Sequence, residues 1–176
     1  MNRTIQNPLF TPQTEWVMPD ELKDLSHYME VAIDLETCDP ELKQLGSGNV
    51  VGRGHIAGVA VAVEGWCGYF PIGHGQGGNL DKNLVKQWLQ DICKDQKKTL
   101  IFHNAMYDVC WLRSFGIDIK GKIVDTMIAA SLINENRFSY RLDYLAKEYC
   151  KIGKDEAVLQ AAAKEYGIDA KAEMYR

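Results

Sequence analysis

The sequence predicts one α/β domain in which helices and a mixed sheet pack in three layers. Strand-like segments come first as a meander and then alternate with helical segments, an order that favours a mixed sheet flanked by helices. The chain has 176 residues, of which 46% are hydrophobic and 25% are charged. This is the composition of an ordinary globular domain, so it excludes disordered and collagen-like chains.

The first 29 residues are expected to form an irregular lead-in, and residues 30–176 the domain itself. The lead-in mixes prolines with polar residues. A short helix is expected near Pro19–Tyr28, and Trp16 is expected to pack the segment onto the domain. The elements expected after it are a strand at 31–36, a loop at 38–55, strands at 55–63 and 66–71, a loop at 73–78, a helix at 84–92, a strand at 99–103, a helix ending near 115, a strand at 123–125, and helices at 126–134, 141–150 and 154–166.

The strands are predicted from period-two alternation and from their turns. In residues 31–36 apolar and acidic or small side chains alternate, as they do in a strand with one buried face. Five proline and glycine residues between positions 40 and 54 indicate the long loop. Glu64-Gly65 separates two β-rich runs by two residues, which indicates a hairpin.

The helices are predicted from apolar stripes and from capping residues. Leucine, valine, tryptophan and isoleucine recur at helical spacing between positions 84 and 92. Asn104 is expected to cap the helix that follows the strand at 99–103. Gly116 and Gly167 suit the left-handed position after a helix end, so each is expected to close a helix.

Charge, cysteine content and hydropathy exclude several classes of protein. The net charge of −4 disfavours a basic protein that coats DNA by neutralising phosphates. Five scattered cysteines, with no Cys-x-x-Cys, disfavour a disulfide framework and a zinc site. The N-terminus does not resemble a signal peptide, and the longest apolar run is too short to cross a membrane. A cytoplasmic protein without a membrane partner is expected.

A pair of carboxylates lies on the first predicted strand. Because successive side chains alternate between faces, Asp34 and Glu36 share the face opposite Val31, Ile33 and Leu35. Two neighbouring negative charges are costly unless a cation lies between them, and Mg²⁺ or Mn²⁺ prefers such oxygen ligands. The alternative is that both acids simply end the strand and face water.

A second polar cluster follows the strand at 99–103. Helical spacing places Asn104, Tyr107, Asp108 and Trp111 on one face, at the N-terminal end of the helix. That end favours negative charge, whether from a side chain or from a phosphate. The alternative is an ordinary N-cap followed by an ordinary first-turn acid.

Taken in order, these clusters resemble a known family. Asp34-Leu35-Glu36-Thr37 and His103-Asn104-Ala105-Met106-Tyr107-Asp108 resemble the first two motifs of the DnaQ-like (DEDD) 3′→5′ exonucleases. The likeness is strongest to the proofreading domains of phage Pol I-type (family A) DNA polymerases, and segments 124–130 and 142–146 extend it. The resemblance implies a ribonuclease-H-like fold with a five-stranded mixed sheet, and two divalent cations, Mg²⁺ or Mn²⁺, bound by four acids.

The resemblance also implies roles for individual residues. Asp34 would bind both metals, Glu36 would bind the tighter metal and orient the attacking water, and Asp108 would hold the second metal through water. The residues expected to contact the terminal nucleotide or line its cleft are Thr37, His103, Asn104 and Tyr107.

The third motif of the family, Tyr-x-x-x-Asp, is not found after Asp108. The spacings from Tyr140 to Asp143 and from Tyr166 to Asp169 are each one residue too short. Asp143 falls in a segment that looks structural in the family, so Asp169 is the better, though weak, candidate for the fourth acid. The chain is therefore expected to stop short of the third motif, as a fragment of a polymerase or as a degenerate stand-alone gene.

The resemblance predicts a metal-dependent 3′→5′ exonuclease domain that removes nucleotides from single-stranded DNA 3′ ends by two-metal hydrolysis. A polymerase domain in the full-length chain would be its partner, and loss of the fourth acid would weaken its activity. Two alternatives stay open: a non-catalytic module that binds nucleic-acid ends or a polymerase, and an RNase D-like enzyme that trims RNA.

The glycine-rich segment Gly73–Gly78 matches the pattern Gly-x-Gly-x-x-Gly of dinucleotide-binding loops. Pro71 crowds the preceding strand, and the next strand lacks the terminal acid that would hold a ribose. The helix is also expected to start after the motif. A connecting loop is therefore the preferred interpretation.

Overall fold

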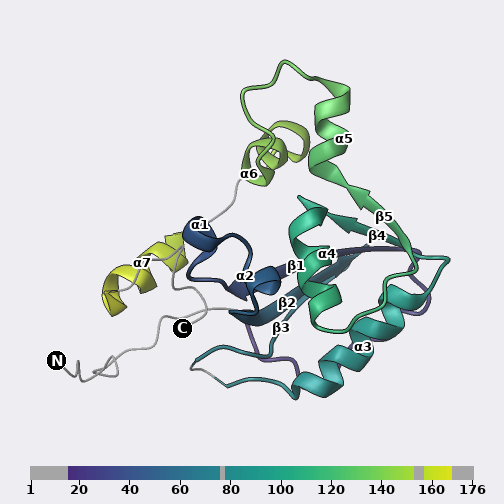
Figure 1. Ribbon diagram of the computed structural model, residues 1–176. Helices are drawn as coiled ribbons and strands as arrows, with labels where there is room; N and C mark the ends of the chain where they lie inside the picture. The colour runs from purple at the N-terminus through teal and green to yellow at the C-terminus, as the bar shows by residue number, and fades with distance from the viewer. Residues whose placement is uncertain (1–15, 76–77, 153–156, 168–176) are drawn as a thin grey trace.

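The computed structural model describes residues 16–75, 78–152 and 157–167, and a five-stranded mixed sheet lies at the centre of this part (Figure 1). Its strands are β1 (Glu30–Cys38), β2 (His55–Val63), β3 (Trp66–Pro71), β4 (Thr99–Phe102) and β5 (Lys122–Asp125), in the order β3-β2-β1-β4-β5. β1, β2 and β3 pair antiparallel, whereas β4 pairs parallel to both β1 and β5. The predicted mixed sheet is confirmed.

The helices of the described residues flank and extend this sheet. They are α1 (Leu42–Leu45), α2 (Gly48–Val51), α3 (Lys82–Lys94), α4 (Ala105–Ser114), α5 (Thr126–Ile133), α6 (Leu142–Leu145), the π-helical turn η1 (Ala146–Cys150) and α7 (Ala157–Tyr166). No helix in these ranges is long and apolar enough to cross a membrane. All five cysteines carry free thiols.

One face of the sheet carries the main core. Val31, Ile33 and Leu35 of β1 are buried there, together with apolar side chains of α3 and α4. α3 begins after Asp81, whose carboxylate accepts hydrogen bonds from the backbone N–H groups of Asn83 and Leu84. The apolar alternation of β1 therefore fixes which face the two helices cover, and it turns Asp34 and Glu36 to the other face.

The hairpin and the helix ends follow the sequence prediction. β2 and β3 are joined at Glu64-Gly65, where Gly65 adopts a left-handed φ of +73°. Gly116 and Gly167 are also left-handed, at +84° and +65°, after α4 and α7. A glycine lacks the Cβ that makes this conformation costly, so these positions end their elements without strain.

The prediction of a short helix near Pro19–Tyr28 is wrong. The described part of the lead-in, from residue 16, has bends and one turn but no helix or strand. Its carbonyls are used by side chains of the domain instead of by helical N–H groups: the buried ammonium of Lys98 donates to the carbonyls of Leu25 and Tyr28, and Trp88 Nε1 donates to that of Lys23. Tertiary hydrogen bonds have overridden a weak local preference.

The long loop expected at 38–55 is only partly irregular, because it contains the single-turn helices α1 and α2. The segment expected as one helix at 141–150 also differs in detail, since α6 passes into a π-helical turn. The remaining predicted helices form close to their expected bounds, except that the expected start of the last one, at 154–156, lies outside the described residues.

Candidate active site

The two polar clusters meet where β1 and β4 separate. These parallel strands pair only from Glu30 to Ala32 on β1, against Thr99 to Ile101 on β4. Farther along β1, the backbone N–H of Leu35 donates to Asp108 Oδ1 of α4 at 3.0 Å. At Leu35, which lies between Asp34 and Glu36, the side chain of Asp108 thus takes the place of a partner strand. Crevices at the carboxyl ends of parallel strands are common ligand sites in α/β sheets.

The electrostatics of Asp108 reflect this position. Its side chain is buried, with 4% exposure, and burial together with the nearby negative charge of Asp34 raises the pKa of Asp108 to about 7. The hydrogen bond from Leu35 offsets only part of that rise. Asp34 itself is exposed and Glu36 is half-buried on the open face of β1. The arrangement therefore holds an excess of negative charge that a bound cation would relieve.

The donor set fits a hard divalent cation that retains water. Asp34, Glu36 and Asp108 offer only carboxylate oxygens, the ligands that Mg²⁺ and Mn²⁺ prefer. Across the residues that the structure describes, no three His, Cys, Asp or Glu side chains form a ready-made metal cage. Mg²⁺ sites commonly use one or two carboxylates and complete the shell with water and substrate phosphates. The acids thus fit that kind of open site.

Two of the residues expected at the nucleotide contact each other. The hydroxyls of Thr37 on β1 and Tyr107 on α4 are 2.7 Å apart, and Tyr107 also donates to Asp39 Oδ2 at 3.1 Å. Burial raises the pKa of Tyr107. Asp39 in turn accepts from the backbone N–H of Gly48 at 3.0 and 3.2 Å, which fastens α2 beside the site. Asp39 has no role in the sequence prediction.

Asn104 does not cap α4 with its side chain, so that prediction is wrong. Its backbone is left-handed, with φ 69°, and its side chain makes no capping hydrogen bond. The cap is Asp125 at the end of β5, whose carboxylate accepts from the N–H groups of Asn104 and Ala105 at 3.1 and 2.8 Å. Asp125 also caps α5 through Met127 and Ile128.

The charge state of Asp125 depends on its four backbone N–H donors, which belong to Asn104, Ala105, Met127 and Ile128. Partial burial acts to raise the pKa of its carboxyl group, but the N–H hydrogen bonds outweigh burial and lower that pKa below its usual value. No sequence pattern links Asp125 to α4, because the residue lies 20 positions after Ala105. Only the pairing of β4 with β5 brings the two together.

His103 lies at the same end of the sheet, with both ring nitrogens engaged. Nε2 donates to the carbonyl of Tyr140 at 2.9 Å, and Nδ1 is 2.9 Å from the Thr126 hydroxyl. The imidazole thus connects β4 with α5 and with the segment before α6. The same side chain also lines an apolar groove on the open face of the sheet.

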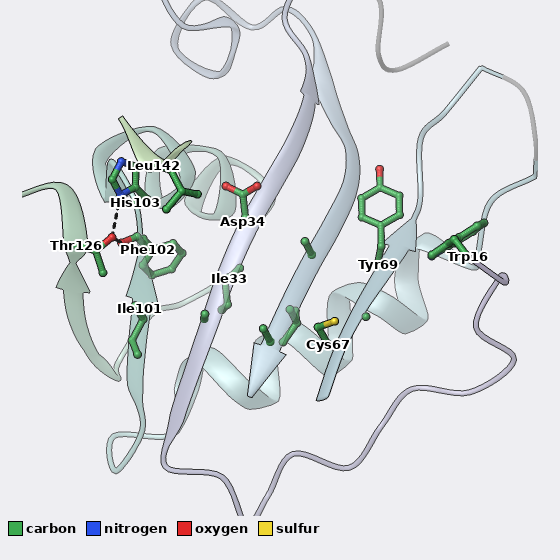
Figure 2. A pocket seen from close by; sticks show the side chains of 15 residues that line it. Trp16, Ile33, Asp34, Cys67, Tyr69, Ile101, Phe102, His103, Thr126 and Leu142 are labelled. Carbon is green, nitrogen blue, oxygen red and sulfur yellow. Dashed lines mark hydrogen bonds between the residues drawn. The ribbon is translucent and has the colours of Figure 1, made fainter. Parts of the chain in front are cut away.

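An apolar groove of about 490 Å³ runs over the open face of the sheet. Figure 2 shows Asp34 and His103 near one end and Tyr69 and Trp16 near the other. Trp16 contacts the Tyr69 ring edge-on, with centroids 6.2 Å apart, so the expectation that Trp16 packs the lead-in onto the domain is confirmed.

The sequence offers Asp143 and Asp169 as candidates for a fourth acid. Asp143 pairs with Arg141 at 3.3 Å at the start of α6. Asp169 lies outside the described residues.

Comparison with known proteins identifies the family of the chain. The sequence matches the family described as 3′-5′ exonuclease over residues 10–169. The chain belongs to that 3′-5′ exonuclease family. It is 40% identical to a DNA-directed DNA polymerase of Pseudomonas phage M6, over 97% of this chain and 27% of the polymerase. It is 32% identical to DNA polymerase DpoZ of Salmonella phage PMBT28, over 81% of this chain and 21% of that protein. The chain thus spans about a quarter of the length of these relatives.

Solved structures support the ribonuclease-H-like fold. Brucella melitensis NrnC bound to pGG superposes with a TM-score of 0.55 at 26% identity, covering 76% of this chain and 59% of NrnC. Escherichia coli RNase D, an exoribonuclease, superposes with a TM-score of 0.50 at 16% identity, covering 74% of this chain and 30% of the enzyme. At that identity the RNase D likeness concerns the fold alone.

Proposed function

We propose that this chain is the proofreading part of a DNA polymerase, which removes nucleotides from single-stranded DNA 3′ ends by metal-dependent hydrolysis. The observation that carries the proposal is the hydrogen bond from Leu35 N–H to Asp108, since it brings the acid of α4 beside the two acids of β1. The phage polymerase relatives support DNA as the substrate and a polymerase as the partner.

Each residue of the site would have a separate role in phosphodiester cleavage. Divalent ions held by Asp34, Glu36 and Asp108 would acidify a water molecule and stabilise the departing 3′-oxygen. Glu36 would orient that water. Thr37 and Tyr107 would hold the terminal nucleotide through their hydroxyls, which contact each other, while Asp39 accepts a hydrogen bond from Tyr107. Tight packing around Asp108 excludes bulk water and so strengthens the electrostatic interactions there.

Three acids in place of four predict weak activity for the chain as given. We expect slow digestion that Mn²⁺ stimulates more than Mg²⁺ does, because the fourth carboxylate of the family pattern is not identified among the described residues. Efficient Mg²⁺-dependent digestion would show instead that a fourth ligand exists within residues 1–176.

Metal binding tests the proposal directly. Free Mn²⁺ is measured by electron paramagnetic resonance during titration of the wild-type chain, of Asp34→Ala, and of Asp91→Ala, which removes an exposed acid of α3. We expect stoichiometric binding that Asp34→Ala abolishes and Asp91→Ala preserves. Shortening of a 5′-labelled single-stranded DNA by the same proteins tests the chemistry. If Asp34→Ala binds Mn²⁺ as the wild type does, the metal site is elsewhere.

An RNA substrate is the second candidate function. The acid motifs of the sequence are shared with RNase D-like enzymes that trim RNA, so RNA is tested beside DNA; NrnC, at 26% identity, was solved bound to pGG. Competition between DNA and RNA oligomers of one sequence decides between the two substrates. If the metal-loaded chain binds 3′ ends without cleaving either polymer, it is the non-catalytic module.

A further inference from the structure

A tyrosine and a histidine form a hydrogen-bonded pair on β3, beyond the clusters that carry the exonuclease motifs. Tyr69 lies on the open face of the sheet, the same face as Asp34 (Figure 2). Its hydroxyl is hydrogen-bonded to Nε2 of His74. The motifs of the sequence assign no function to this pair, and the groove alone does not require a polar group at that point.

The hydroxyl of Tyr69 lies close to Glu36. Glu36 of β1 pairs with Gly58 of β2, and a Cβ built on Gly58 would be 2.0 Å from the phenolic oxygen. The oxygen therefore occupies the space above Gly58, one strand away from Glu36, and neighbouring strands are only about 4.8 Å apart. Only glycine leaves this space open. Burial raises the pKa of Tyr69, and the negative charge of Glu36 raises it further, which agrees with this proximity.

The loop after β3 holds His74 in place. The Asn79 side chain accepts from the backbone N–H of His74 at 2.8 Å and donates to its carbonyl at 2.9 Å. His55 Nε2 donates to the carbonyl of Gly73 at 2.8 Å. A Cβ at Gly73 would be 2.6 Å from the carbonyl oxygen of Ile56, so the loop also requires glycine there. Gly73 and Asn79 thus position the imidazole of His74.

We infer that Tyr69, held by His74, is a positioning residue for Glu36, an inference that rests on the proposed metal function. His74 Nε2–H donates to the phenolic oxygen, and the phenolic O–H donates to one carboxylate oxygen of Glu36. The other carboxylate oxygen is then directed toward a cation beside Asp34. Hydrogen bonds of this kind fix the orientation of metal ligands, and their loss typically lowers metal affinity or activity about 10- to 100-fold.

Conservative variants of the wild-type chain test the inference. Tyr69→Phe removes only the hydroxyl, and Tyr28→Phe makes the same change in a half-buried tyrosine that precedes the other end of β1. Mn²⁺ affinity is measured by electron paramagnetic resonance, and thermal unfolding is followed by circular dichroism without metal. We expect Tyr69→Phe to weaken Mn²⁺ binding about 10-fold. Tyr28→Phe should bind Mn²⁺ as the wild type does.

Changes at His74 separate positioning from packing. His74→Gln keeps an Nε2 donor and should retain most of the Mn²⁺ affinity, whereas His74→Leu should lose as much as Tyr69→Phe. Wild-type affinity in Tyr69→Phe, alongside impaired binding by Asp34→Ala, would overturn this inference alone. Equal binding by the wild type and Asp34→Ala would overturn the metal function and this inference with it.

Discussion

The two halves of β1 have the same alternating pattern but different surroundings. From Glu30 to Ala32 the strand pairs parallel with β4, and its antiparallel pairing with β2 begins at Ala32. From Leu35 onward it remains paired with β2, through a register shift after Glu36, while Asp108 takes the place of β4. Both halves bury apolar side chains on the core face, but only the second half places carboxylates beside a gap in the sheet. A strand that loses one partner exposes backbone groups that side chains of other elements can bind.

This comparison predicts that changes in the second half impair chemistry, while changes in the first half impair folding. The largest effect is expected for Glu36→Gln. Glu30→Gln is the matched change in the half of β1 that pairs with β4. Loss of a charged group at the reacting centre should slow DNA digestion about 100-fold in Mn²⁺. Glu30→Gln should digest at the wild-type rate. Equal rates for the two variants would remove the functional distinction between the halves.

The second largest effect is expected for Val31→Ala in the first half. Val31 is fully buried, so the lost apolar contacts and the resulting cavity should lower the free energy of unfolding by about 2 kcal/mol. For a chain of this size that corresponds to a fall of about 5 °C in the midpoint of thermal unfolding. Mn²⁺ affinity below that temperature should not change. A variant with wild-type stability would contradict the core assignment of this half.

A smaller effect concerns pH in the absence of metal. The folded-state pKa of Asp108 is about 7, above the usual 3.8, so between these values the folded chain holds a proton that the unfolded chain has lost. Stability from this group is therefore full below about pH 4 and falls as pH rises to 7. Asp108→Asn keeps an oxygen acceptor for Leu35 N–H but does not titrate. Its unfolding midpoint should fall less than that of the wild type between pH 5 and pH 8, measured by calorimetry. An unchanged pH profile would show that Asp108 is not the titrating group.

The smallest effect is expected at Gly48, next to the second half of β1. A Cβ there would lie 2.2 Å from the carbonyl oxygen of Arg53 and 2.7 Å from Asp39 Oδ1. Gly48→Ala should therefore displace Asp39 from Tyr107 and raise the KM for single-stranded DNA a few-fold, with kcat little changed. Val50→Ala is the control, because that side chain of α2 is 77% exposed and its loss leaves Asp39 untouched. A similar KM in both variants would show that the Asp39 network does not position the nucleotide.

The fold could largely be predicted from the sequence because its signals are local. The alternation in β1, the turn at Glu64-Gly65 and the glycine after α4 each depend on a few neighbouring residues. The lead-in could not be predicted in this way. Its conformation depends on the ammonium of Lys98 and the indole of Trp88, which lie about 70 positions away in the chain.

The same distinction between local signals and contacts across elements applies to the candidate site. Asp34, Glu36 and Asp108 could be proposed from ordered motifs, since each motif lies on one strand or one helix. The residues that fix their surroundings could not, because Asp39, Tyr69, His74 and Asp125 act across elements. Their partners are set by sheet register and helix packing, as at Gly58, where a missing side chain makes room for Tyr69.

Asp125 joins two helices through one carboxylate. Its oxygens accept from the first N–H groups of both α4 and α5. Any tilt of α5 away from the sheet must therefore stretch the hydrogen bonds that anchor the start of α4, three residues before Asp108. A displacement of α5 would therefore also shift the start of α4, and with it the position of Asp108 relative to the acids of β1.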